Sequence, residues 1–314
     1  MAELIFFVAG TGAIAGAIGV VVLRNPFYAV LALVGHLLAL AALFLLLRAE
    51  FVAAAQVVVY AGAVMVLYVF VVAYVGNLDQ PLRPGGAGLG GIAILFAAVL
   101  LVELLIATLG SGLAIIDSHG APYDPAFGGP AQIGELFLTK FLLAFEIASF
   151  LLLVAAVGAV ILAGRRRGLP GKRRRPRGTS TSRAPPSPER WPRPCTRRRP
   201  SRPATPSTAE GGERLMAIGW YLAVSTFVFC IGAAGVLTRR NPLVVLLCLE
   251  LMLNAANLAL VAFSRAHGSG DGQIFALIVM VVAACEVVIG LGLIVAMHRR
   301  RLLIDVDEMS ELRG

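Results

Sequence analysis

Eight long stretches of the sequence are almost free of charged residues, and this feature restricts the possible folds more than any other. A helix needs about 20 mostly apolar residues to cross the hydrocarbon core of a membrane. The stretches that meet this length span residues 4–23, 27–47, 51–75, 89–109, 136–163, 217–238, 241–264 and 273–297. They predict an all-α integral membrane protein, with five transmembrane helices before a basic tract and three after it.

The composition agrees with a chain that is surrounded mostly by lipid. Hydrophobic residues make up 58% and charged residues 14% of the chain, whereas soluble domains have about 45–50% and about 25%. The net charge of +9 comes from one region, because residues 165–215 hold 16 lysines and arginines against three acidic residues. The remainder of the chain is mildly acidic.

The basic tract separates two apolar regions. It is rich in Arg, Pro, Ser, Thr and Gly, a composition that cannot build a hydrophobic core. We therefore expect a five-helix membrane domain over residues 1–164, a disordered linker over 165–215 and a three-helix membrane domain over 216–314. A nucleic-acid-binding role is disfavoured, because the tract contains one aromatic residue, Trp191, and no fold that would position it.

Motifs for soluble enzyme chemistry are missing from the sequence. There is no Gly-rich dinucleotide or P-loop motif, and the cysteines are scattered singly with no histidine at metal-ligand spacing. The loops between the first five stretches are short except for residues 110–130, which leaves no room for a separate catalytic domain. Any chemistry must therefore be performed by groups inside the membrane, and we expect the chain to bind no cofactor or metal itself.

Two glutamates are the first candidates for such chemistry. Glu250 lies in "LLCLELMLNAANLAL", where Asn254 and Asn257 fall on its helical face. Glu286 lies in "VMVVAACEVVIGLGLIVAM", and the lengths of the two helices place both carboxyls at nearly the same depth. Because an acid in the membrane is costly and rarely accidental, we interpret the pair as a proton relay. The alternative is structural, with each acid paired to a partner subunit.

The third apolar stretch contains a second group of candidates. Gln56 and Tyr60 share one face at helical spacing, and Gly62 permits either tight packing or a local bulge. From the pattern alone, a core tyrosine with an anchored hydroxyl is equally plausible. Glu146 lies near the middle of the fifth stretch, with Lys140 nearer its end.

Two further titratable groups lie within apolar stretches. His36 fits a satisfied buried histidine better than a proton carrier, and Glu103 has the least support among the intramembrane acids.

A short repeat links the two halves of the chain. "VVLRNPFYAVLAL" and "VLTRRNPLVVLLC" both place Arg-Asn-Pro between a first and a second apolar stretch. Proline is favourable at the start of any helix, so convergent helix-start chemistry explains this similarity at least as well as common descent does.

Longer segments resemble a known family. "VYAGAVMVLYVFVV" and "FEIASFLLLVAAVGAVILA" resemble the J subunit of the proton-pumping NADH:quinone oxidoreductase, respiratory complex I, over roughly residues 1–164. "RRNPLVVLLCLELMLNAANLALVAF", "DGQIFALIVMVVAACEVVIGLGLIVAMHRR" and the tail "EMSELRG" are similar to its K subunit over residues 216–314. The sequence is thus identified as a fusion of the two.

The resemblance implies roles for individual residues. Glu250 and Glu286 match the two membrane glutamates of the K-subunit proton pathway. Tyr60 and Gly62 lie on the J helix whose π-bulge forms and disappears as quinone reduction is coupled to pumping, and Glu146 matches an acid of the fifth J helix. Where some members carry an acid, this chain has Gln56, which puts proton transfer at that position in doubt.

The resemblance also implies the surroundings of the chain. NADH, FMN, iron–sulfur clusters and quinone would be bound by partner subunits. Partners would include the quinone-site subunit, the antiporter-like subunits and lipid, in a bacterial inner membrane, with the N-terminus periplasmic and the C-terminus cytoplasmic. One alternative is a small subunit of a multisubunit Na⁺/H⁺ antiporter, and another is a scaffold whose acids only hold larger subunits together.

The charge distribution raises a topological conflict. By the positive-inside rule, the first five helices end in the cytoplasm at Arg165, whereas the last three must begin outside, near Met216. The polar tract cannot cross the membrane as a helix, and an irregular crossing would leave backbone groups unpaired in hydrocarbon. We favour two polypeptides, the second starting at Met216. A fusion that is later cut and an unusual path of the tract are the alternatives.

Overall fold

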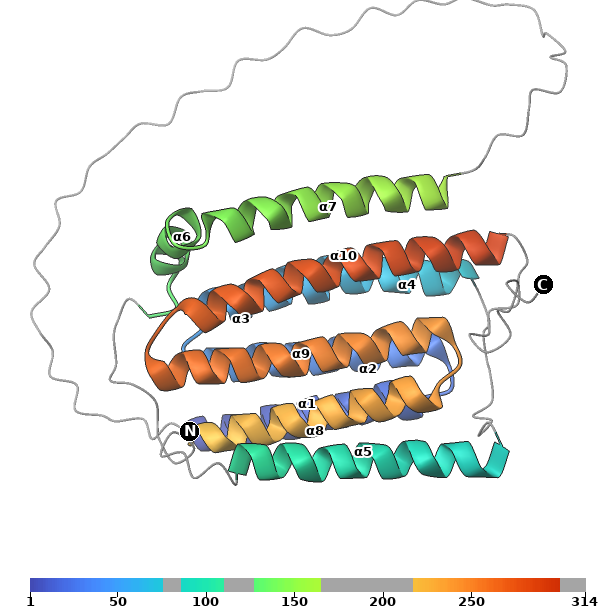
Figure 1. The fold of residues 1–314 in the computed structure, drawn as a ribbon, viewed down its shortest axis with the longest axis horizontal. Coiled ribbons are helices and arrows are strands. Elements are labelled where there is room, and N and C mark those ends of the chain that lie inside the picture. Colours follow the sequence, from blue (N-terminus) through green and yellow to red (C-terminus); the bar gives the residue numbers. More distant parts are fainter. Residues whose placement is uncertain (76–85, 110–126, 165–216, 300–314) are drawn as a thin grey trace, which may run out of the picture. The chain divides into compact units, whose positions relative to one another are not determined.

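The computed structural model describes residues 1–75, 86–109, 127–164 and 217–299, and the regular elements in these ranges are all helices (Figure 1). The prediction of an all-α membrane protein is confirmed. The helices before residue 165 are α1 (Ala2–Val22), α2 (Pro26–Leu46), α3 (Glu50–Ala55), η1 (Gln56–Val64), α4 (Met65–Val75), α5 (Gly86–Leu109), α6 (Pro130–Leu138) and α7 (Leu142–Ala163). Those after it are α8 (Ile218–Thr238), α9 (Pro242–His267) and α10 (Asp271–Arg299).

Seven spans within the described residues are long and apolar enough to cross a membrane, with α3, η1 and α4 forming one continuous span. The one predicted span not among these seven, residues 89–109, corresponds to α5, whose apolar section is Leu95–Leu104. The linker at 165–215 and the "EMSELRG" tail lie outside the described residues.

The fifth predicted stretch is two helices rather than one. The chain breaks at Thr139–Phe141, where the Thr139 hydroxyl donates to the Glu135 carbonyl at 2.7 Å and Lys140 pairs with Asp271 of α10 at 2.7 Å. Figure 1 shows that α6 does not continue the axis of α7 beyond this break. The membrane-spanning helix therefore begins at Leu142, six residues later than the apolar pattern predicts.

The second helix of each half, α2 before the basic tract and α9 after it, begins in the same way. The Asn25 side chain accepts a hydrogen bond from the backbone N–H of Phe27 at 2.9 Å, and the Asn241 side chain accepts one from that of Leu243 at 3.0 Å. Each asparagine is followed by proline at the first helical position. The two Arg-Asn-Pro segments are thus equivalent N-caps.

The helix contacts inside these two hairpins also correspond. Gly16 and Gly232 occupy equivalent positions, nine residues before the capping asparagine of their hairpin. A Cβ on either glycine would collide with an equivalent residue of the second helix, which lies eleven positions after that asparagine. The distance from this Cβ would be 2.9 Å to His36 Cβ for Gly16 and 2.8 Å to Met252 Cγ for Gly232. Both hairpins therefore need glycine for the same close approach of their helices.

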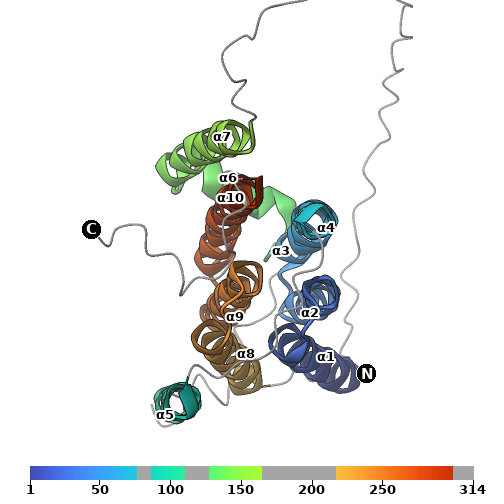
Figure 2. The same cartoon turned by 90° about the vertical axis from the view of Figure 1, so that its right-hand side faces the viewer.

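The two hairpins pack side by side with their first helices parallel (Figure 2). At one end the rings of Phe6 and Tyr221 meet edge to face, with centroids 4.8 Å apart. At the other end Arg239 Nε donates to the carbonyl oxygen of Val21 at 2.8 Å, and its Nη2 donates to that of Leu23 at 3.0 Å. Arg239 thus satisfies carbonyls left unpaired at the end of α1.

Burial lowers the pKa of the Arg239 guanidinium from its usual value. An arginine still remains protonated under such conditions, so its positive charge also stabilises the negative end of the α1 dipole.

The helices share two ends, which we call the Arg24 end and the Arg48 end. Helices α1, α8 and α10 finish at the Arg24 end, and Arg299 Nη1 donates to the Ala163 carbonyl, so α7 finishes there as well. Helix α8 starts at the Arg48 end. Residues Gly164 and Ala217, which flank the basic tract, therefore lie at opposite ends of the helices, as the charge distribution predicts.

Candidate functional site

The continuous span Glu50–Val75 contains nine residues of π-helix, η1, between its two α-helical parts. A Cβ on Gly62, inside this segment, would contact only the Val57 carbonyl oxygen, at 3.4 Å. Of the two possibilities that the glycine left open, the structure has the local bulge rather than tight packing against another helix. Such π-segments are uncommon and often occur at functional sites.

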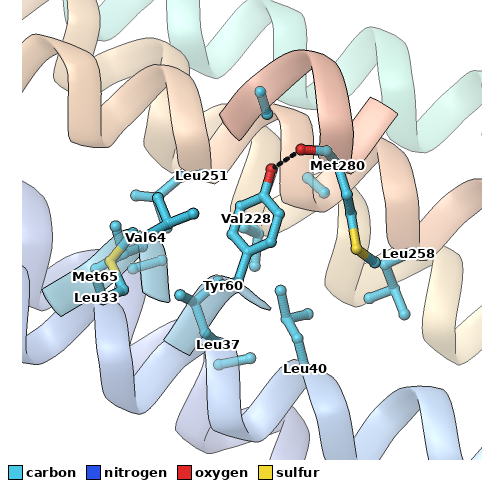
Figure 3. Packing of buried hydrophobic residues seen from close by; sticks show 14 of the residues in the cluster. Leu33, Leu37, Leu40, Tyr60, Val64, Met65, Val228, Leu251, Leu258 and Met280 are labelled. Carbon is cyan, nitrogen blue, oxygen red and sulfur yellow. Dashed lines mark hydrogen bonds between the residues drawn. The ribbon is translucent and has the colours of Figure 1, made fainter. Parts of the chain in front are cut away.

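Tyr60 projects from η1 into the core between the two halves of the chain. Its hydroxyl donates a hydrogen bond to the backbone carbonyl of Met280 in α10 at 2.8 Å, and Figure 3 shows its ring beside Leu37 and Leu40 of α2. The side chain is 1% exposed. The hydroxyl is therefore anchored, and it ties the π-helix to the helix that carries Glu286.

Gln56 connects the π-helix to the helix that carries Glu250. Its Nε2 donates to Asn254 Oδ1 at 3.3 Å, and Asn254 Nδ2 donates to the backbone carbonyl of Glu250 at 2.8 Å. These side chains are fully buried or nearly so. A chain of two amides thus links η1 to the turn of α9 that positions the Glu250 carboxyl.

The Glu250 carboxyl lies in the interior of the protein. The residue is 2% exposed, and its Oε2 has no hydrogen-bond partner in the described part of the chain. A buried polar atom without a partner is costly and calls for an explanation. A site that must both hold and release a proton is one explanation.

Glu286 lies at the same depth as Glu250. Helices α9 and α10 are antiparallel, and contacts on both sides of the two glutamates set their register. A Cβ on Gly290 would lie 2.9 Å from Leu246 Cδ2, and one on Gly272 would lie 2.8 Å from Ser264 Cβ. Residue numbers rise in opposite directions along antiparallel helices, so residues that face each other at one depth have a constant sum of their numbers. The pairs Gly290–Leu246 and Gly272–Ser264 have the same sum as Glu286–Glu250, which places the two glutamates at one depth. Glu286 itself is exposed on α10, whereas Glu250 is buried.

The remaining candidate residues lie apart from this site. Glu146 on α7 and Glu103 on α5 are exposed, and Lys140 is paired with Asp271. His36 is buried between α1 and α2, with Nδ1 2.7 Å from the Ala13 carbonyl oxygen and Nε2 unpartnered. None of these groups has a described contact with Glu250.

The buried polar residues that were not identified from the sequence include Gln273 and Arg265. Gln273, in the first turn of α10, is fully buried, and neither atom of its amide has a described partner. Arg265, in the last turn of α9, is 5% exposed and lies under the Phe127 ring, 5.4 Å from its centroid. Both residues flank a helix connection, where polar residues usually indicate a solvent-exposed turn, so the pattern carried no signal of their burial.

Metal ligands do not gather at the site. No group of three His, Cys, Asp or Glu side chains that could hold a metal ion occurs among the residues that the structure describes. The cysteines Cys230, Cys248 and Cys285 are free thiols in the core.

Comparison with known protein families gives two matches that divide the chain at the basic tract. Residues 16–162 match NADH-ubiquinone/plastoquinone oxidoreductase chain 6, and residues 220–314 match chain 4L of the same enzyme. The chain is also similar to NADH-quinone oxidoreductase subunit K 1 of Symbiobacterium thermophilum, with 57% identity over 93 residues, which are 30% of this chain and 91% of that protein.

The chain joins a J-type and a K-type membrane subunit of NADH:quinone oxidoreductase. It therefore belongs to the membrane arm of respiratory complex I. The J-type region contributes the π-helix with Gln56 and Tyr60, and the K-type region contributes Glu250 and Glu286. The Gln56–Asn254 and Tyr60–Met280 hydrogen bonds consequently cross the boundary between the two subunit types.

Proposed function

We propose that this complex I chain couples quinone reduction to proton translocation, with Glu250 and Glu286 as relay carboxylates. The observation that carries the proposal is the buried Glu250 carboxyl, whose helical turn is joined through Asn254 and Gln56 to a π-helix. Backbone hydrogen bonds span five residues in a π-helix and four in an α-helix, so conversion between the two rotates the residues that follow. Such a rotation would change the Gln56–Asn254 contact and the surroundings of Glu250.

The proposed transfer runs sideways within the membrane. Glu250 binds a proton in the interior, and the amides on its helical face orient the carboxyl, since an amide can hydrogen-bond an acid in either protonation state. Glu286 lies at the same depth on the neighbouring helix and faces outward. It would receive the proton and pass it to an adjoining subunit. Tyr60 would hold η1 in register with α10 through Met280.

The partners are proposed from what the chain leaves exposed. An acid on the lipid-facing surface of a membrane helix is costly, so Glu286 needs a protein partner. Helix α7 is almost entirely exposed and carries Glu146. We propose that the antiporter-like subunits and the quinone-site subunit cover these surfaces. NADH, FMN, iron–sulfur clusters and quinone would be bound by other subunits of the complex.

The proposed orientation places the Arg24 end in the cytoplasm of a bacterial cell and the N-terminus in the periplasm. Arg24, Arg239, Arg240 and Arg299 lie at the Arg24 end, and positive residues are enriched in cytoplasmic loops.

The relay is tested by changing each glutamate to glutamine in the assembled complex and measuring proton translocation together with quinone reduction. We expect each change to abolish proton translocation while the complex still assembles. If both variants keep quinone reduction coupled to proton translocation, the relay proposal is wrong. Loss of assembly in both variants would support a scaffold, and sodium-dependent transport without NADH oxidation would support an antiporter.

The Tyr60→Phe variant tests the proposed coupling helix. It keeps the ring in the core but removes the hydroxyl that donates to Met280. A neutral hydrogen bond contributes about 0.5–1.5 kcal/mol, so we expect proton translocation to fall by up to about tenfold with assembly retained. Tyr74→Phe is the matched control, because Tyr74 is 58% exposed near the end of the same span. Equal proton translocation in both variants would contradict a coupling role for the Tyr60 hydroxyl.

The number of polypeptides is a further proposal. Because Gly164 and Ala217 lie at opposite ends of the helices and the tract between them is polar, we propose two chains, the second starting at Met216. Intact mass measurement of the purified complex should then find two species, each below 33.0 kDa. A single species of 33.0 kDa in an active complex would contradict this proposal.

A further inference from the structure

Several buried polar atoms along α9 have no hydrogen-bond partner among the described residues. They are Glu250 Oε2, Gln56 Oε1, both amide atoms of Asn257, both amide atoms of Gln273, and Arg265 Nε. Each residue is at least 95% buried. Native interiors leave very few such atoms unpaired, and bound water is their usual partner in polar interiors.

These atoms follow one line rather than scattering through the core. Asn254, on the face of α9 shared with Glu250 and Asn257, meets the π-helix. Gln273 reaches the same line from α10, because the register set by Gly272 and Ser264 places it next to the last turns of α9. At 1.5 Å per residue, Asn257 lies roughly 10 Å along α9 from Glu250, and Gln273 lies roughly 9 Å beyond that.

The line leads from mid-membrane to the Arg48 end. On the Arg24 side of Glu250, the Tyr68 hydroxyl is the one comparable atom among the described residues, and His36 Nε2 lies off the line, between α1 and α2. At the Arg48 end, the Gln273 amide nitrogen lies 3.2 Å from where a Cβ on Gly128 would be. The turn at Phe127–Gly128 therefore packs directly over the last polar group of the line.

We propose that a chain of water molecules runs along α9 from Glu250 past Asn257 to Gln273, and that it connects the relay to the Arg48 end of the protein. This inference rests on the proposed role of Glu250. The waters would supply the missing hydrogen bonds of the amides, and they would carry protons between Glu250 and the surface by exchange along the chain. Val261 and Ala276, both fully buried, lie at helical levels between Asn257 and Gln273 and would form the apolar part of the route.

The direct test uses the whole complex. In a cryo-electron microscopy map that resolves ordered water, density should lie within hydrogen-bond distance of both the Asn257 and the Gln273 amides. The proposal is overturned if these amides are paired with protein groups in every class of particles, or if the region between them is dry in every class.

A functional test uses a matched pair of variants. Asn257→Leu removes the polar atoms, whereas Asn257→Ser keeps a hydroxyl that can bond water. We expect the leucine variant to lose most proton translocation per NADH oxidised and the serine variant to retain it. Gln273→Leu serves as the second position should Asn257→Leu fail to assemble. Unchanged proton translocation in an assembled leucine variant at either position overturns the route.

The two proposals can fail separately. If Glu250→Gln retains full proton translocation, the relay is wrong whether or not water is found beside Asn257. If Glu250→Gln stops translocation but Asn257→Leu and Gln273→Leu do not, the relay stands and the water route is wrong.

Discussion

Replacing Glu250 with glutamine is expected to stop proton translocation by the assembled complex. Glutamine has the same shape as the carboxyl but cannot take up or release a proton near neutral pH. A positioned group that transfers protons typically contributes about 10²- to 10⁴-fold to a rate, so translocation should fall by at least roughly 10²-fold. Because the substitution preserves side-chain volume at a site that is 2% exposed, the packing of α9 should be unaffected.

The measurement is proton uptake or release by membrane vesicles per NADH oxidised, with assembly checked on a native gel. Glu135→Gln is the matched control, since Glu135 is an exposed acid on the short helix α6 and has no described contact with the relay. Full translocation in the control with loss in Glu250→Gln isolates the intramembrane carboxyl. Equal and complete translocation in both variants would contradict the proposed relay.

Replacing Gly235 with alanine is expected to weaken the contact between the J-type and K-type regions. An added Cβ would overlap Cys248 Sγ of α9 and would lie 2.9 Å from Val21 Cγ2 of α1. One methyl group would thus disturb both the α8–α9 hairpin and its contact with α1. Overpacking in a well-packed core costs about 1–3 kcal/mol, which we expect to lower the temperature at which the complex dissociates.

A second substitution should reverse part of this effect. Cys248→Ala removes the sulfur that the new methyl group would strike, so Gly235→Ala with Cys248→Ala should dissociate at a higher temperature than Gly235→Ala alone. Gly35→Ala is the control, because a Cβ at Gly35 would meet no atom within 4 Å. Equal loss of stability in Gly35→Ala would mean that the helix contacts at Gly235 do not explain the result.

The residues changed in these two predictions lie in different parts of the molecule. Gly235 belongs to the contacts that hold it together, and Glu250 belongs to the part proposed to move protons. The paired hairpins α1–α2 and α8–α9 share glycine contacts and asparagine caps, and Arg239 joins their ends. The π-helix and α10 pack beside this frame and carry Tyr60 and Glu286. A segment that changes helical form needs such a fixed neighbour, because its rotation acts on the site only relative to something that stays in place.

Much of the helical architecture could be predicted from the sequence. Runs of apolar residues long enough to span a bilayer leave the helix as the backbone conformation that satisfies its own hydrogen bonds. The Asn-Pro pairs at residues 25 and 241 mark helix starts through local capping chemistry. The spacing of Glu250 and Glu286 within their helices placed both at one depth, and the α9–α10 register agrees.

The sequence did not reveal the break between α6 and α7. Thr139 and Lys140 interrupt an otherwise apolar run, but a single lysine is often tolerated near the end of a membrane helix. Lys140 instead pairs with Asp271, which lies 131 residues further along the chain, so local spacing carried no signal of this contact.

The sequence by itself determined which residues lie in the membrane, where most helices begin and which acids are expensive to bury, because these properties depend on composition and local spacing. Only the tertiary structure decided how the two regions meet. The bond from Gln56 to Asn254 spans 198 positions and that from Tyr60 to Met280 spans 220. The burial of Glu250 against the exposure of Glu286 likewise depends on which helices pack around each one. Periodicity reports the faces of a helix, and packing alone selects the neighbour that each face contacts.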